Sequence, residues 1–154
     1  MADSCTQIYI QLIFVVKCRQ AHIRPEWEEE LYKYITGIVQ KRGHKMMAIN
    51  GMPDHTHLLI GFKPAESLSH LVQETKKAST NFINDNQFCP QKFQWQAGYA
   101  AFSYSKSHVE RVYWYIQNQK AHHRKRTFRE EFSSFLKAYE IETGRKRPFD
   151  FWEN

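Results

Sequence analysis

The 154-residue sequence has few cysteines and no long hydrophobic run. Its three cysteines, Cys5, Cys18 and Cys89, form no CxxC pair, which argues against a disulfide framework and against a cysteine-rich zinc site. The apolar run over residues 8–16 is too short to span a bilayer and contains Gln11, and no basic signal-peptide start precedes it. We therefore expect a reduced, cytoplasmic protein without a membrane partner, in which this run is a buried strand.

Internal repeats, low-complexity tracts and recognisable linkers are also absent. A chain of this length, with 42% hydrophobic and 15% aromatic residues, can bury one sizeable core. We therefore expect a single domain over residues 1–154.

Positive charge is in excess, with 22 Lys and Arg against 16 Asp and Glu. The net charge of +6 favours encounter with a polyanion, without choosing between nucleic acid and an anionic membrane. Basic residues concentrate at 120–126 and 145–147. The first cluster is open to two interpretations, a phosphate-contacting surface or a solvated basic helix end.

Hydrophobic periodicity predicts alternating strands and helices. Strands are expected over residues 8–16, 45–52, 55–62 and 93–104, the last one bent at Gly98. Helices are expected over residues 25–43, 68–86, 108–123 and 128–141. This order is typical of an α+β, ferredoxin-like (RRM-like) fold, in which helices pack on an antiparallel sheet. Because the fold has many unrelated functions, the function must be argued from a site.

Two histidines flank Thr56 in the run over residues 53–60. If this run is a strand, His55 and His57 lie on one face and can hold one metal ion together. The plain alternative is a pair of half-exposed histidines, because an HxH pair alone is weak evidence for metal. A third ligand must come from elsewhere, since strand alternation sends Asp54 to the opposite face unless the turn redirects it.

The predicted helix over residues 108–123 has two different faces. Val109, Val112, Tyr113 and Ile116 fall at helical spacing and form the expected buried stripe. Tyr115 lies on another face with Gln119, four residues further on, so both can approach the same ion. Taken alone, this pair also fits a solvated helix face.

An HxH strand followed by YxxxQ on a helix resembles the HUH single-tyrosine transposases of the IS200-like insertion-sequence family, which cut and rejoin single-stranded DNA. The resemblance covers most of the chain and rests on residues 17–19, 52–59, 95–103 and 115–123. The family's motif has a bulky hydrophobic residue between the histidines, where this chain has Thr56. This β-branched side chain should point away from the ion, so the departure is mild.

The resemblance implies that His55, His57 and Gln119 bind a divalent metal, Mg²⁺ or Mn²⁺, and that Tyr115 is the nucleophile. Ligand type alone does not exclude zinc. A 5′-phosphotyrosine intermediate would retain the energy of the cleaved bond, so no ATP would be needed. The sequence contains no GxxxxGKS/T phosphate-binding loop, which agrees with this expectation.

The resemblance further implies single-stranded DNA with hairpin-containing element ends as partner, and a homodimer with active sites shared between subunits. The basic C-terminal extension, about 124–154, would follow the tyrosine helix. We expect DNA contacts from Arg111, Lys120, His122, Arg124, Lys125 and Arg126.

Two alternatives to a mobile-element transposase stay open. A domesticated relative that processes hairpin repeats would keep the same site residues. A non-catalytic module that binds single-stranded nucleic acid would fit the basic charge and the aromatic strands, although the glycine-aromatic signature of an RRM is missing. Such a module would need no metal and would survive loss of Tyr115.

Overall fold

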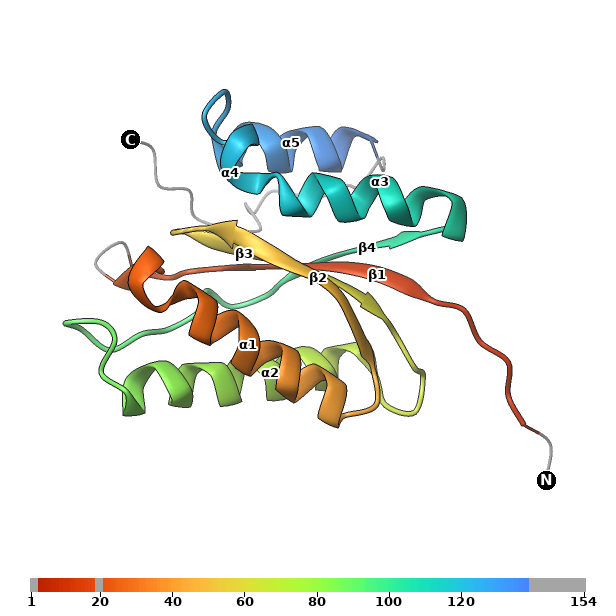
Figure 1. Ribbon diagram of the computed structural model, residues 1–154, viewed down its shortest axis with the longest axis horizontal. Coiled ribbons are helices and arrows are strands. Elements are labelled where there is room, and N and C mark those ends of the chain that lie inside the picture. Colours follow the sequence, from red (N-terminus) through yellow and green to blue (C-terminus); the bar gives the residue numbers. More distant parts are fainter. Residues whose placement is uncertain (1–2, 19–20, 139–154) are drawn as a thin grey trace.

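Four strands form one antiparallel sheet with helices on both faces in the computed structural model, which describes residues 3–18 and 21–138 (Figure 1). The strands are β1 (Tyr9–Val15), β2 (Lys45–Met52), β3 (His55–Gly61) and β4 (Ala100–Tyr104), in the order β2-β3-β1-β4. The helices are α1 (Pro25–Lys41), α2 (Leu68–Asp85), α3 (Lys106–Gln117), α4 (Gln119–His122) and α5 (Phe128–Ala138). The expected α+β fold is confirmed.

Helices α1 and α2 cover one sheet face, and α3 to α5 cover the other (Figure 1). The two central strands, β1 and β3, are accordingly buried on both faces, as expected for the opening apolar run. Because side chains alternate along a strand, Leu12, Phe14 and Leu58 face α1 and α2, whereas Ile13 and Leu59 face the other helix layer.

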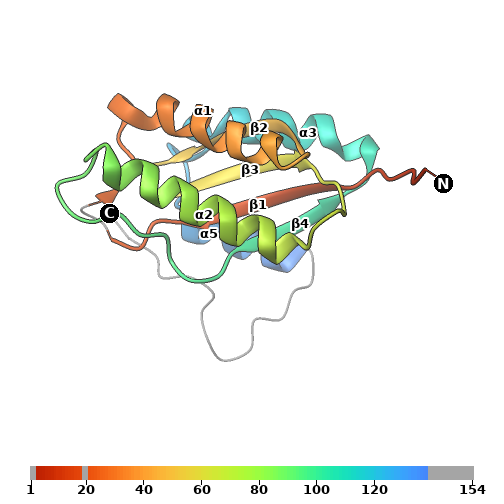
Figure 2. The ribbon, with the colours of Figure 1, turned by 90° about the horizontal axis from the view of Figure 1, so that it is seen from below.

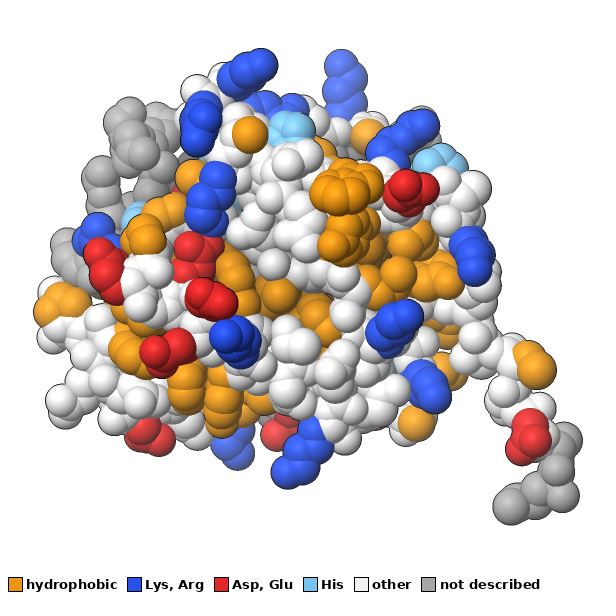
Figure 3. All heavy atoms as spheres, in the orientation of Figure 1, with side chains coloured by type: hydrophobic (Ala, Val, Ile, Leu, Met, Phe, Trp, Pro, Cys, Tyr) orange, Lys and Arg blue, Asp and Glu red, His pale blue; other side chains and the backbone are white. Residues whose placement is uncertain are grey.

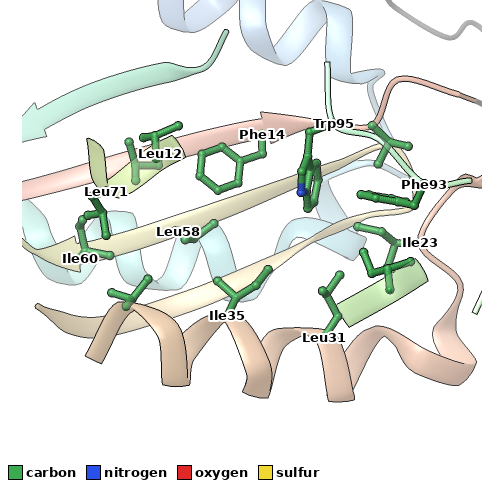
Figure 4. Packing of buried hydrophobic residues seen from close by; sticks show 14 of the residues in the cluster. Leu12, Phe14, Ile23, Leu31, Ile35, Leu58, Ile60, Leu71, Phe93 and Trp95 are labelled. Atoms are coloured by element: carbon green, nitrogen blue, oxygen red, sulfur yellow. The ribbon is translucent and has the colours of Figure 1, made fainter. Parts of the chain in front are cut away.

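Helix α1 begins with Pro25 at its first turn and buries one stripe at a spacing of four residues: Trp27, Leu31, Ile35 and Val39. It lies beside α2 on the same face of the sheet (Figure 2). Between these helices and the sheet is the main core, in which Phe14 packs edge-on against Trp95 at a centroid distance of 5.7 Å (Figure 4).

The expected strand over residues 93–104 is too long. Regular pairing with β1 begins only at Ala100, and Trp95 makes an isolated bridge to Val16. Between them, Gly98 has a φ of 82°, and the Lys76 ammonium donates to the carbonyl oxygens of Gln96 and Gly98. These two carbonyls accept from the Lys76 side chain of α2 rather than from a neighbouring strand, so the ladder is interrupted here.

The expected helix over residues 108–123 is two helices. Asn118, with φ −96° and ψ 19°, separates α3 from α4. Asparagine is a weak helix former because its side chain competes for backbone hydrogen bonds. The last expected helix begins at Phe128 as predicted, and its expected end at residue 141 lies outside the described residues. Among the described helices, none has the length and apolarity needed to cross a membrane.

Gly51 of β2 offers a test of the packing behind the two histidines. It pairs with Thr56, and a Cβ built on it would lie 2.2 Å from the carbonyl oxygen of His55. Since this neighbour is backbone, we expect Gly51→Ala to lower the free energy of unfolding by about 1–3 kcal/mol, measured by urea denaturation.

Gly37→Ala is the matched control. A Cβ at Gly37 meets nothing within 4 Å, and the position is inside α1, so alanine should stabilise the protein by about 0.5–1 kcal/mol. Equal stability of the two variants would contradict the close approach at Gly51.

Candidate active site

His55 and His57 project from β3 toward α3 and α5, and both are fully buried. Their ring centroids lie 5.0 Å apart. This burial differs from the alternative of two half-exposed histidines. Thr56 points the other way, into contact with Tyr32 of α1, as its place between the histidines predicts.

The Nδ1 atom of each imidazole is held by an oxygen acceptor. His55 Nδ1 lies 2.7 Å from the Asp54 carboxylate, and His57 Nδ1 lies 2.6 Å from Gln11 Oε1. Because both partners accept, the neutral form of each imidazole carries its proton on Nδ1, and in that form Nε2 can bind a metal ion. The turn does redirect Asp54, but toward the back of His55 rather than toward the ion.

The structure brings the predicted site residues together. Gln119, fully buried at the start of α4, places Oε1 3.2 Å from His55 Nε2. Tyr115, half-buried on α3, packs edge-on to His57 with ring centroids 6.3 Å apart. Both residues come from the same chain as the histidines. The break at Asn118 between α3 and α4 does not prevent Tyr115 and Gln119 from reaching them.

Sequence reasoning missed the carboxylate at the centre of this cluster. Glu131 of α5 is fully buried, and its Oε1 lies 3.1 Å from His57 Nε2 and 3.5 Å from His55 Nε2. Its Oε2 accepts hydrogen bonds from the Tyr115 hydroxyl and, at 3.1 Å, from Gln119 Nε2. Glu131 therefore contacts all four residues that the sequence singled out.

A signal for Glu131 was present in the sequence. Phe128, Phe132 and Phe135 mark the apolar stripe of α5, and Glu131 falls on the same stripe, three residues after the first and four before the last. A carboxylate on an apolar stripe needs a buried partner. Gln11, in the middle of the apolar first strand, is a second signal of the same kind.

A third histidine also lies against the carboxylate. His123, directly after α4, has a side chain that is only 6% exposed, and its Nε2 is 3.4 Å from Glu131 Oε1. Burial alone would raise the pKa of Glu131, but the imidazoles of His57, His123 and His55 outweigh it and hold that pKa well below its usual range. Glu131 is therefore ionised.

The pKa values of His55 and His57, the two candidate metal ligands, are shifted in opposite directions. Burial opposes charge on His55, but Asp54 and Glu131 together raise its pKa to about 9. Burial lowers the pKa of His57. Burial and the neighbouring Glu131 raise the pKa of Tyr115 well above its usual value, against the opposing effect of Arg126, so its hydroxyl is protonated at neutral pH.

A cavity of about 500 Å³ opens beside Tyr115, between α3 and α5. Its wall includes Tyr104, Phe135 and two of the expected DNA-contacting residues, Arg111 and Arg126. The Arg126 guanidinium donates to the Tyr115 hydroxyl at 3.2 Å. Tyr115 and two positively charged side chains therefore line the same cavity.

The other basic residues expected at DNA have different surroundings. Lys120 is bonded to Glu28 and to the Gly51 carbonyl, and the His122 ring stacks on Tyr115 at 4.7 Å. Arg124 and Lys125 are exposed. In Figure 3, Lys and Arg side chains lie along the upper edge, over α3 to α5, while a group of acidic side chains lies lower on the left, over the beginning of α1. The cluster at 145–147 lies outside the described residues.

The buried donor atoms form a set that can hold a metal ion. Ligand atoms of His55, His57 and Glu131 all lie within 4.8 Å of one another. Gln119 Oε1 is next to the same His55 nitrogen. Two imidazoles with carboxylate and amide oxygens suit a divalent ion such as Mn²⁺, and less closely Mg²⁺, which prefers oxygen ligands.

Comparison with known proteins places this architecture in a family. The family profile described as "Transposase IS200 like" matches residues 4–119. The chain belongs to the IS200-like transposase family. The expected family is thereby confirmed, and with it a relationship to DNA-cleaving enzymes. The match ends before Glu131, so α5 lies outside the shared segment.

Individual relatives agree with this assignment. The IS200-like chain is 25% identical to the ISDra2 transposase TnpA of Deinococcus radiodurans over 118 residues, which are 73% of this chain and 84% of that protein. Two solved structures share its fold. One is a candidate transposase from D. radiodurans R1, with a TM-score of 0.62, 23% identity and coverage of 77% of this chain and 95% of that chain. The other is a REP-associated tyrosine transposase bound to a REP hairpin, with a TM-score of 0.59, 15% identity and coverage of 80% and 74%, respectively.

The raised pKa of His55 makes the stability of this IS200-like transposase depend on pH. Since the folded protein holds the His55 proton more tightly than the unfolded chain, this stabilisation is complete below the ordinary pKa of 6.5 and is lost as the pH rises toward 9. In chelator, we expect the free energy of unfolding to fall by about 1–2 kcal/mol between pH 6.5 and 8.

Urea denaturation at the two pH values measures this loss, and His55→Gln should remove it. The window ends at pH 8 because the pKa of Lys76, lowered by burial to about 8, adds an opposite trend above it. An unchanged pH dependence in His55→Gln would show that another group is responsible.

Proposed function

We propose that this transposase nicks and rejoins single-stranded DNA through a 5′-phosphotyrosine on Tyr115, with a divalent metal held by His55 and His57. The observation that carries the proposal is the shared contact with Glu131. The Tyr115 hydroxyl and both Nε2 atoms converge on this one buried carboxylate, so a nucleophile lies directly beside a candidate metal centre.

The residues present fit a metal ion on the chemistry of their donors. Asp54 and Gln11 fix the imidazole tautomers, and Gln119 Oε1 supplies the third donor that family resemblance implies. When bound, Mg²⁺ or Mn²⁺ would neutralise the charge that develops on the scissile phosphate. Mn²⁺ agrees better with two nitrogen donors.

Tyr115 would be the nucleophile when the strand is cut and the leaving group when it is rejoined. Its oxygen forms a bond to the 5′ phosphate, the bond from phosphorus to the 3′ oxygen breaks, and a free 3′ hydroxyl is released. Attack of a 3′ hydroxyl on the phosphotyrosine later reseals or transfers the strand, so no ATP is consumed. The raised pKa of Tyr115 keeps its hydroxyl protonated before attack, so this proton has to leave for the bond to phosphorus to form, and the departing 3′ oxygen gains one.

Arg126 and Arg111 are the best placed of the expected DNA-contacting residues. Both line the cavity beside Tyr115, where guanidinium groups can hold a phosphate. Exposed Arg124 and Lys125 would contact the backbone further out. We propose hairpin-containing single-stranded DNA as substrate. The REP hairpin bound by one relative of the same fold is consistent with this substrate class.

Tyr115→Phe tests the chemistry. With labelled single-stranded DNA from around the gene and Mn²⁺ or Mg²⁺, we expect the native protein to form a denaturation-resistant protein–DNA adduct. Tyr115→Phe and chelator should each reduce the adduct below detection, because one removes the nucleophile and the other the metal. Gel electrophoresis under denaturing conditions is the measurement.

Tyr113→Phe is the matched control, since Tyr113 is half-buried on the same helix and packs edge-on against Trp114. It should form adduct like the native protein. Adduct that persists in Tyr115→Phe would show that another residue attacks. Tight binding without adduct in the native protein would favour the non-catalytic binding module.

A mixing experiment tests how the site is completed. Family resemblance implies a homodimer with shared sites, but one chain here has its own Tyr115 beside its own His57, which favours completion in cis. We expect a mixture of Tyr115→Phe with the double variant His55→Ala/His57→Ala to form no adduct. Recovery of adduct in the mixture would instead support exchange of tyrosine helices between subunits.

A further inference from the structure

The two oxygens of Glu131 face two different sets of partners. Oε1 lies toward the imidazoles, 3.1 Å from His57 Nε2, and Oε2 accepts from the Tyr115 hydroxyl and from Gln119 Nε2. A carboxylate oriented in this way can bind a cation with one oxygen while it holds a hydroxyl with the other.

Aromatic packing fixes the position of this carboxylate. Phe128, three residues before it, stacks on His55 at a centroid distance of 4.0 Å and an interplanar angle of 17°. Phe135, four residues after it, packs edge-on to Tyr115 at 5.7 Å. Helix α5 thus packs against a candidate metal ligand, His55, at one end and against Tyr115 at the other, with Glu131 between the two contacts.

Helix α5 is also separate from the part of the chain that the family profile matches, which ends at Gln119. The two histidines, Gln119 and Tyr115 all lie within that matched part. Glu131 is therefore a component of this site that the family assignment does not supply.

We propose that Glu131 is a ligand of the divalent cation through Oε1 and positions the Tyr115 hydroxyl through Oε2, so that α5 is part of the catalytic centre. The positioning half rests on the proposed function, because it takes Tyr115 as the nucleophile. The ligand half depends only on the cluster of His55, His57 and Glu131.

Charge is the physical reason for the ligand half. When they bind a metal ion, the two imidazoles are neutral and the Gln119 amide carries no charge, whereas a carboxylate brings one negative charge to this fully buried site. The affinity of a site for a divalent cation rises with the charge of its ligands. Removing the charge of Glu131 should therefore weaken metal binding, with or without DNA.

Geometry is the reason for the positioning half. Tyr115 belongs to α3. Its hydroxyl is held by Glu131 of α5 and by Arg126 from the loop between α4 and α5. The separation of the hydroxyl from a bound cation would then be set by one buried side chain, which contacts the hydroxyl and can bind the cation. Such fixed placement of a reacting group supports in-line attack.

Calorimetric titration of the DNA-free protein with Mn²⁺ tests the ligand half. Glu131→Gln keeps the size of the side chain and removes its charge, and we expect Mn²⁺ affinity to fall by about 10–100-fold. Glu130→Gln, which changes the neighbouring exposed glutamate on the same helix, should bind Mn²⁺ like the native protein. Native affinity in Glu131→Gln would overturn the proposal.

Glu131→Asp is the second variant, in case the uncharged side chain disturbs folding. It keeps the charge but is shorter by one methylene, so Mn²⁺ affinity should lie between those of the native protein and Glu131→Gln. Circular dichroism establishes that each variant is folded. Native affinity in Glu131→Asp together with adduct formation above the native rate would identify Glu131 as an obstruction and contradict a ligand role.

Thermal unfolding without DNA tests the contact with the hydroxyl. Tyr115→Phe removes the donor of one hydrogen bond and Glu131→Gln removes the charge of its acceptor, so the double variant should shift the Tm by less than the sum of the single shifts. Additive shifts would overturn the positioning half. Tyr113→Phe combined with Glu131→Gln is the control pair and should be additive.

Adduct formation at saturating Mn²⁺ separates this proposal from the proposed function. If Glu131 only bound metal, saturation would restore Glu131→Gln to the native rate. We expect the rate to remain reduced by about tenfold or more, because the hydroxyl has lost its charged acceptor. If the native protein forms no adduct on any strand, the proposed function fails, while the two DNA-free measurements still decide the roles of Glu131.

Discussion

An ionised carboxylate buried between a sheet and three helices determines how the site is built. Glu131 is stable there only because imidazole, amide and hydroxyl groups surround it, since an unpartnered buried charge is costly. Each of these groups comes from a different element, namely β3, α4 and α3. The carboxylate thus couples the packing of the second helix layer to the arrangement of the site.

Strand alternation makes this arrangement possible. Along β3, Thr56 and Leu58 belong to the side of α1 and α2, while His55 and His57 turn to the opposite face. The two functions of the strand, closing the main core and presenting imidazoles, are therefore separated by its period of two. Gly51 across the ladder allows the close approach of β2 that this strand needs.

Much of the architecture could be predicted because it depends on local patterns. The buried stripe of α1, the strand pair around Gly51 and the buried first strand follow from periodicity and turn residues. The prediction of one continuous strand over residues 93–104 was wrong, because Lys76 of α2 binds backbone carbonyls in this segment and interrupts the pairing. The split of the tyrosine helix at Asn118 was also missed, although Tyr115 and Gln119 still reach the same cluster.

The sequence by itself determined the family, through an HxH strand and a YxxxQ segment whose spacings do not depend on distant contacts. The role of Asp54, the burial of the histidines and the position of Glu131 were decided only by the tertiary structure. Glu131 is 74 residues away from His57 in the chain. Periodicity can indicate which side of a helix is buried, but which face of which strand it packs against depends on long-range contacts.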